Sequence, residues 1–418
     1  MTGFVVRGGR VVRRNRVERL DVAIDHGRVA ALEPPGATPR GRLDVDADGL
    51  LVMPGAVDAH VHFDDPGREW WEGFDCGSAA AAAGGVTTVV DMPIDSDPPT
   101  ITVAAMRAKA AAARARSRVD VAIWAGLVPG SVARLAAMAE AGAAGFKAFA
   151  CPSGWDDFPA VDDASLAAGC SIAAAYDLPV AVHCERPELG PGPESEVAAV
   201  RWAAAIARDH GARLHVVHAS AVEAVDEARR WSGVTIETCP HYLTLNDHDV
   251  ARIGSTARCN PPIRDEANRA ALWSRVRDGA IDWVASDHSP CPPSWRTGSR
   301  PWAGISGVQL TVAVLFDAGL DPVDIARLTT AAARALRLPR KGAIEPGADA
   351  DIVLVDPDAT WVVAPERLHD RHAASPLAGR TLKGEIVRTW VRGRTVYERA
   401  TGVVDAGGGD VLAPGGRL

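Results

Sequence analysis

The chain has 418 residues and a formal net charge of −8, with 47% hydrophobic and 23% charged residues. This composition is ordinary for a soluble globular protein and excludes a disordered or fibrous chain. The acidic balance gives no reason to expect a nucleic acid or an anionic membrane as a partner. No apolar run approaches the roughly 18 residues of a membrane span.

The N-terminus and the cysteines indicate in which cell compartment we expect the protein. The first ten residues have the pattern of a strand and lack the apolar segment of a secretory signal. Seven cysteines are scattered along the chain without a Cys-x-x-Cys pair. An odd number without pairing favours a reduced chain over a disulfide scaffold, so we expect a cytoplasmic protein.

Both ends of the chain alternate short β-like runs with turns. These runs are Phe4–Val6, Leu20–Ile24, Val29–Leu32, Ala350–Val355, Thr360–Val363 and Val387–Val391. We expect residues 1–53 and 344–418 to form one small β domain assembled from both termini. From Ala406 onward the glycine-rich sequence predicts a loose tail.

Between residues 54 and 343 the pattern changes to strand, loop and alanine-rich helix, repeated eight times. Strands that alternate with helices predict a parallel sheet, and eight such units predict an α/β fold of the (β/α)8 TIM-barrel type. The catalytic groups of such barrels sit at the C-terminal ends of the strands. The expected strands are Val57–His62, Thr87–Met92, Val119–Ala125, Gly145–Phe149, Val180–His183, Leu214–His218, Val234–Thr238 and Ile281–Ser286.

Six side chains of metal-binding type stand at or near the C-terminal ends of these expected strands. His60 and His62 are two residues apart on the first strand, so both imidazoles leave the same face. Two neutral imidazoles aimed at one point suit a divalent metal. The other four side chains are those of Lys147, His183, His218 and Asp287.

Some of these positions allow more than one interpretation. His215 and His218 differ by three, so they should face opposite sides of their strand, and we expect His215 to be structural. Lys147 lies in an apolar strand, where it either pairs with a carboxylate or is deprotonated. Asp287 is either a turn or helix-capping residue, or a metal ligand that also moves protons.

Together, the six positions resemble the amidohydrolase superfamily, within the cyclic amidohydrolases that include dihydroorotase, hydantoinase and allantoinase. The resemblance runs from the first strands to about Glu398. It implies a small β-sandwich domain formed by both termini, and a pair of divalent metal ions in the barrel. Zinc is the default for such ligands, and iron, manganese or cobalt are alternatives.

The same resemblance implies a role for each ligand. His60, His62 and Asp287 would bind the first metal. His183 and His218 would bind the second. Lys147, as its carbamate, would bridge the two, and Asp287 would also act in catalysis as the group that moves protons.

Within this group the chain is most similar to allantoinases. The stretches that carry this likeness are His62–Arg68 with Trp71–Phe74, Gly84–Pro93, Glu237–Thr244, Cys259–Asp265, Ser286–Cys291 and Trp302–Gly307. Dihydroorotase fits worse, because Asp64 and Cys291 stand where similar dihydroorotases hold the substrate carboxylate with Arg and His. An acid at that place repels a carboxylate.

Four residues are candidates for substrate binding. Asp64 and Asp95 stand where allantoinases usually have a neutral polar residue and Asn, and a carboxylate only accepts hydrogen bonds. Either they are solvated loop residues, or the substrate is cationic or richer in N–H donors. By resemblance, Asn260 and Ser289 contact the substrate and His241 supports a ligand.

We therefore expect hydrolysis of a small cyclic amide, or its reversal, with ring opening of allantoin to allantoate as first choice. Alternatives are a hydantoinase, dihydropyrimidinase or dihydroorotase-like enzyme, or a specialised cyclic imide or lactam hydrolase or cyclase. The other class is a non-catalytic scaffold homologue, but such proteins typically lose metal ligands, and all six are present. By resemblance we expect a homo-oligomer, a tetramer or a dimer.

Overall fold

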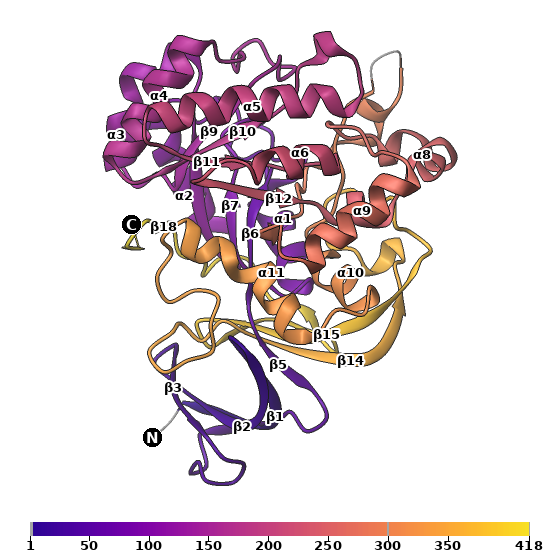
Figure 1. Ribbon diagram of the computed structural model, residues 1–418. Coiled ribbons are helices and arrows are strands. Elements are labelled where there is room, and N and C mark those ends of the chain that lie inside the picture. Colours follow the sequence, from indigo (N-terminus) through magenta and orange to yellow (C-terminus); the bar gives the residue numbers. More distant parts are fainter. Residues whose placement is uncertain (1–2, 299–300, 418) are drawn as a thin grey trace.

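The computed structural model describes residues 3–298 and 301–417 (Figure 1). Two large sheets organise it: an eight-stranded sheet that forms the barrel, and a nine-stranded sheet built from both ends of the chain. Figure 1 shows the strands of the nine-stranded sheet at one end of the molecule, with the barrel and its helices at the other. The predicted (β/α)8 barrel is confirmed.

The barrel strands follow one another in chain order, each paired in parallel with the next. The eighth has two residues, so the predicted strand Ile281–Ser286 is shorter than expected. The barrel closes just beyond it, where His62 N donates to His288 O at 2.7 Å beside a bridge from Val61 to His288. The strands are β6 (Ala56–Val61), β7 (Val86–Asp91), β8 (Asp120–Gly126), β9 (Gly145–Phe149), β10 (Pro179–His183), β11 (Arg213–Val216), β12 (Val234–Thr238) and β13 (Trp283–Val284).

Helices cover the outside of the barrel (Figure 1). Five α-helices of the described residues begin at a side-chain cap, in which Thr102, Asp162, Asn246, Asp265 or Asp321 accepts a backbone N–H two or three residues on. No helix of the described ranges is long and apolar enough to cross a bilayer. The α-helices are α1 (Gly73–Ala83), α2 (Val103–Arg116), α3 (Leu135–Glu140), α4 (Asp163–Ala175), α5 (Pro193–Asp209), α6 (Val222–Ala228), α7 (Pro240–Thr244), α8 (Asp247–Ile253), α9 (Glu266–Arg277), α10 (Thr311–Asp317) and α11 (Pro322–Ala335). Short 3₁₀ turns are η1 (Pro129–Arg134), η2 (Pro187–Leu189), η3 (Gly254–Ala257), η4 (Pro293–Arg296) and η5 (Pro365–Arg367).

Alternate residues of the barrel strands face two different layers. In β8, Ile123 belongs to the large apolar cluster shared with the helices, whereas the next residue, Trp124, belongs to a second cluster of side chains from the barrel interior. In β9, Phe146 belongs to the outer cluster, so its neighbour Lys147 points inward. This alternation carries a lysine into the centre of the fold.

The second sheet joins the two termini. Its seam is the antiparallel pairing of β5 with β14, where Met53 pairs with Val353. A single residue, Gly55, separates β5 from the first barrel strand. A Cβ there would lie 2.1 Å from Thr87 Oγ1, so only glycine fits this close approach. The strands are β1 (Phe4–Arg13), β2 (Arg16–Asp25), β3 (Arg28–Glu33), β4 (Leu43–Asp46), β5 (Leu51–Pro54), β14 (Ile352–Val362), β15 (Thr381–Val391), β16 (Arg394–Glu398) and β17 (Gly402–Val403).

The prediction of a loose tail from Ala406 is wrong. Val121 N in β8 donates to Asp410 O at 2.9 Å, and the following residue, Val411, forms a bridge to Val121. Val411 and Leu412 are buried, and Leu412 joins the cluster inside the barrel. Beyond them, β18 (Leu412–Ala413) and β19 (Gly416–Arg417) form a short hairpin. The tail is ordered because burying two large apolar side chains offsets the entropy lost by a few residues.

A buried ion pair fixes the segment that follows His62. Lys109 on α2 and Asp91 at the end of β7 are both fully buried. Lys109 Nζ donates to Asp91 Oδ2 at 2.6 Å and to Met92 O at 2.8 Å. The other carboxylate oxygen accepts from Phe63 N at 3.0 Å. The pair therefore ties helix α2 to the loop that begins at the end of the first barrel strand.

Lys109→Met should lower the free energy of unfolding by about 3–5 kcal/mol, because it leaves the Asp91 carboxylate buried without its cation. Arg107→Met is the matched control: it lies on the same helix with an exposed side chain and should change stability by less than about 0.5 kcal/mol. Urea unfolding of both variants measures the difference. Equal stabilities would contradict the role given to the buried pair.

Candidate active site

One cavity of about 650 Å³ lies at the C-terminal ends of the barrel strands. Its volume is typical of small-molecule sites, which span roughly 300–1,000 Å³. The side chains that line it come from separate strands and from the loops that follow them. They include all six predicted metal ligands: His60, His62, Lys147, His183, His218 and Asp287.

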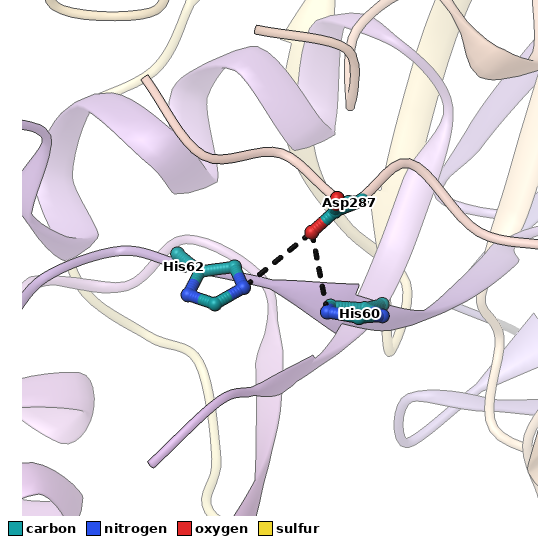
Figure 2. A group of neighbouring side chains, drawn as sticks. All are labelled: His60, His62 and Asp287. Carbon is teal, nitrogen blue, oxygen red and sulfur yellow. Dashed lines mark ion pairs between the residues drawn. The ribbon is translucent and has the colours of Figure 1, made fainter. Parts of the chain in front are cut away.

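His60, His62 and Asp287 face one another, as Figure 2 shows. Asp287 Oδ1 lies 3.2 Å from His60 Nε2 and 3.5 Å from His62 Nε2. All three side chains are buried, and their ligand atoms lie within 4.8 Å of one another. Burial raises the pKa of Asp287, but His60 and His62 outweigh it and hold the pKa at about 2. This group has the composition of a site for one divalent cation.

His183 and His218 form a second group. His183 Nδ1 lies 2.9 Å from His218 Nε2. His218 lies two residues past the end of β11 and has a φ of 39°, a left-handed conformation that breaks the alternation of the strand. The expectation that His215 and His218 face opposite sides is therefore wrong. His215 also points into the barrel, where its Nε2 lies 3.1 Å from Glu237 Oε2.

Lys147 is fully buried and lines the same cavity. Within residues 3–298 and 301–417, no acceptor takes a hydrogen bond from its Nζ, so the alternative of a carboxylate partner does not hold. Burial lowers the pKa of Lys147 to about 8, although Asp287 and Glu237 act in the opposite direction. The neutral amine that burial favours is the form that reacts with carbon dioxide. The carbamate itself stays a prediction.

Three of the candidate ligand histidines have a carboxylate behind them, on the ring nitrogen that faces away from the other ligands. A carboxylate there keeps the proton on the outer nitrogen and leaves the lone pair of the other nitrogen for a cation. The pairs are His60 Nδ1 with Glu237 Oε1 at 2.7 Å, His62 Nδ1 with Asp95 Oδ2 at 2.7 Å, and His183 Nε2 with Glu185 Oε2 at 2.6 Å.

Glu237 is a site residue that the sequence analysis missed. It is fully buried in β12 and meets His60, His215 and the indole of Trp283, whose Nε1 donates to Oε2 at 2.7 Å. Burial raises its pKa, but His215 and His60 outweigh this and hold the pKa well below its usual range. The sequence contains one signal for Glu237, because burying a carboxylate inside an apolar strand costs free energy unless the carboxylate has partners.

Asp64 and Asp95 are both buried, so neither is a solvated loop residue. Asp95 lines the cavity, and its Oδ1 accepts from Trp155 Nε1 at 2.6 Å while Oδ2 faces His62. Asp64 is not among the residues that line the cavity. Burial and the neighbouring Asp95 raise the pKa of Asp64 well above its usual range. Asp95 therefore supports His62, and the structure gives Asp64 no contact with the cavity.

The remaining predicted residues lie at the cavity or just behind it. Asn260 and Ser289 both line the cavity, and Ser289 Oγ donates to Asp287 O at 3.0 Å. His241 is buried, and neither of its ring nitrogens has a partner among the described residues. It forms a group with Cys239 and Asp287 whose ligand atoms lie within 4.8 Å of one another.

The residues present fit a pair of divalent cations. Burial lowers the pKa of His62, but Asp287 and Asp95 outweigh it and raise the pKa to about 9. Burial keeps the pKa of His60 below its usual value and that of His218 far below, so these two imidazoles are neutral donors. A buried set of imidazoles and carboxylates, with an unpartnered lysine beside them, has the donor chemistry that such cations require.

Comparison with known proteins points to one family. The amidohydrolase family matches residues 51–396. An allantoinase from Rubrobacter xylanophilus is 43% identical over 99% of this chain and 97% of the relative, and an allantoinase from Solibacter usitatus is 42% identical over 98% and 96%. Among solved structures, an L-hydantoinase (dihydropyrimidinase) from Arthrobacter aurescens superposes with a TM-score of 0.93 at 29% identity, covering 99% of this chain and 100% of that one. The chain belongs to the amidohydrolase family.

Proposed function

We propose that this chain is a metal-dependent hydrolase that opens a cyclic ureide ring, with allantoin as the substrate and allantoate as the product. One observation carries the proposal: six candidate ligands from five barrel strands, or from the residues just after them, line one cavity, and three of the imidazoles have a carboxylate on the outer nitrogen. The choice of ring is supported by the relatives named allantoinase, at 42–43% identity over nearly the whole chain.

The ligand groups suggest how two cations would be held. His60, His62 and Asp287 would hold one divalent cation. His183 and His218 would hold the other, and Lys147 would bridge them as its carbamate. Zinc is the first choice of metal, with iron, manganese or cobalt as alternatives. When bound, such a pair supplies a hydroxide nucleophile at neutral pH and polarises the carbonyl under attack.

Asp287 is the residue best placed to move protons. Its carboxylate lines the cavity, and its Oδ1 faces His60 and His62, which leaves Oδ2 to take a proton. The nitrogen released by ring opening is a poor leaving group as an anion and needs a proton. We propose that Asp287 accepts the proton of the nucleophile and passes it to that nitrogen.

The charges around the cavity favour a neutral ring. Among the described residues that line it, Lys147 and the exposed Arg258 are the only basic side chains apart from histidines. Asp95, Glu185 and Asp287 are acidic. A substrate carboxylate, as in dihydroorotate, would meet repulsion here. A ureide offers several N–H donors, which suits carboxylate acceptors.

Hydantoin hydrolysis is the second candidate. The L-hydantoinase structure superposes over the whole chain with a TM-score of 0.93. Allantoin carries the same five-membered ureide ring as a hydantoin, so one arrangement of ligands suits both. Asn260 and Ser289 line the cavity and are the proposed contacts to such a ring.

We also propose the wider setting of the enzyme. Residues 54–343 would form the catalytic domain, and residues 1–53 and 344–418 the small β domain. All seven cysteines are free thiols, which agrees with a reducing cytoplasm. The indoles of Trp70 and Trp295 are 53% and 42% exposed, and exposed aromatic surface of this kind supports a homo-oligomer, a tetramer or a dimer.

The test is a screen of the purified chain, after metal analysis, for ring opening of allantoin, hydantoin, dihydrouracil and dihydroorotate. We expect two metal ions per chain and the fastest turnover with allantoin. Good turnover of another ring without turnover of allantoin would overturn the choice of substrate. A chain that binds no metal and opens none of the rings would point to the scaffold class.

Asp287→Asn should keep its bound metal but lose about 10²- to 10⁴-fold in kcat, because an amide cannot carry the proton. The matched control is Asp156→Asn, which removes the same charge from an exposed residue outside the cavity. Steady-state kinetics with metal content measured on the same samples separates loss of chemistry from loss of metal. A metal-replete Asp287→Asn protein with near wild-type kcat would remove Asp287 from this role.

Glu237→Gln should weaken metal binding about 10- to 100-fold, because the amide no longer holds the proton on His60 Nδ1 as a carboxylate does. Competition with a chromophoric chelator measures this affinity directly. Glu223→Gln, on the exposed face of α6, is the control and should leave it unchanged. Equal affinities in the two variants would show that Glu237 is needed only for the fold.

A further inference from the structure

Two thiols of the described chain line the cavity, those of Cys151 and Cys259. Only Cys151 belongs to a group with metal-binding composition. Its Sγ, a ring nitrogen of His183 and a carboxylate oxygen of Glu185 all lie within 4.8 Å of one another. Because all three residues line the cavity, a solute inside it can reach them. The proposed ring opening gives no role to the thiol.

Contacts with Glu185 and Phe149 hold the ring of His183 within this group. His183 Nε2 lies 2.6 Å from Glu185 Oε2, and the ring stacks on Phe149 with centroids 4.8 Å apart. Lys147, buried and without a hydrogen-bond partner among the described residues, lines the same wall. The ring of His183 and the carboxylate of Glu185 are therefore already in place beside the Cys151 thiol.

We propose that Cys151, His183 and Glu185 form a second binding site, which shares His183 with the proposed metal pair, for a thiophilic divalent cation such as Cd²⁺ or Zn²⁺. Binding forms a sulfur–metal bond and releases the thiol proton to solvent, with no change of oxidation state. The imidazole contributes a nitrogen lone pair and Glu185 an oxygen. A thiolate in the set selects soft or borderline cations over Mg²⁺ and Ca²⁺.

The site competes with the metal pair of the proposed function. A neutral imidazole has one lone pair, so His183 serves either this site through Nε2 or the position beside His218 through Nδ1. A cation on Cys151 therefore withdraws His183 from the centre. The thiol site fills in the metal-free chain and is suppressed once the centre is loaded.

The experiment titrates the metal-free full-length chain with Cd²⁺ and follows the ultraviolet charge-transfer absorption from thiolate to cadmium. We expect a band with the amplitude of a single thiolate. Cys151→Ser should lose it. Cys259→Ser is the matched control, because Cys259 is as deeply buried in the same cavity wall, and should keep it. A chain preloaded with zinc should need more Cd²⁺ for half of the amplitude.

A second thiol-containing group provides a further test of whether the band comes from Cys151. Cys239, with His241 and Asp287, is the other thiol-containing cluster of the described residues, so Cys239→Ser belongs in the series. Loss of the band in Cys239→Ser with retention in Cys151→Ser overturns the proposal, as does a wild-type chain without any band. In the wild-type chain, Cd²⁺ should also protect Cys151 from alkylation, mapped by mass spectrometry, which needs no variant to fold. No readout uses ring opening, so failure here leaves the proposed function standing.

Discussion

The site depends on one constraint: a buried imidazole has two nitrogens, and something must fix which of them faces the cavity. Carboxylates placed behind the rings fix this orientation, and Glu237 contacts two imidazoles and an indole. From β12 it meets His60 on the first barrel strand, His215 on β11 and Trp283 on the last strand. One side chain therefore sets ring orientation across both ends of the sheet. Its removal would leave buried donors without acceptors, each at a cost of about 1–3 kcal/mol.

The contact that closes the barrel also positions Asp287. The last strand is too short to close the barrel, and closure passes to the loop, where His62 N donates to His288 O at 2.7 Å. That bond places the residue before His288 directly against His62. Asp287 has a φ of 46°, a left-handed conformation that costs an L-residue about 1–2 kcal/mol. Ser286, held by its N–H to Asp58 at 3.1 Å, secures the strained turn. Strain of this kind concentrates where a side chain must be aimed against the preference of the backbone.

The barrel and its six candidate ligands could be predicted from the sequence because both follow from local pattern: strands alternate with helices, and ligand-type residues end the strands. The features that the sequence analysis missed or misplaced depend on contacts between segments far apart in the chain. Strand alternation misplaced His215, since it assumes that β11 continues to His218, whereas a left-handed residue ends the pattern. The glycines that predict a loose tail are visible in the local sequence, whereas the barrel-interior cluster that buries Leu412 comes from residues far away in the chain. Glu237 was visible as an acid in an apolar strand, but its partners come from three other strands.

The balance of charge in the site explains why so many acids surround one cavity. Glu237, Asp95, Glu185 and Asp287, when ionised, bring four negative charges into a buried region, and buried charges must be compensated. Two divalent cations would balance them. Without cations the compensation has to be protons, and the pKa is raised to about 9 for two imidazoles, His62 beside Asp95 and His183 beside Glu185. Loading the site would then exchange protons for metal. The carboxylates that orient the rings thus also draw cations into the cavity, because protons neutralise the negative charge of these carboxylates only in part.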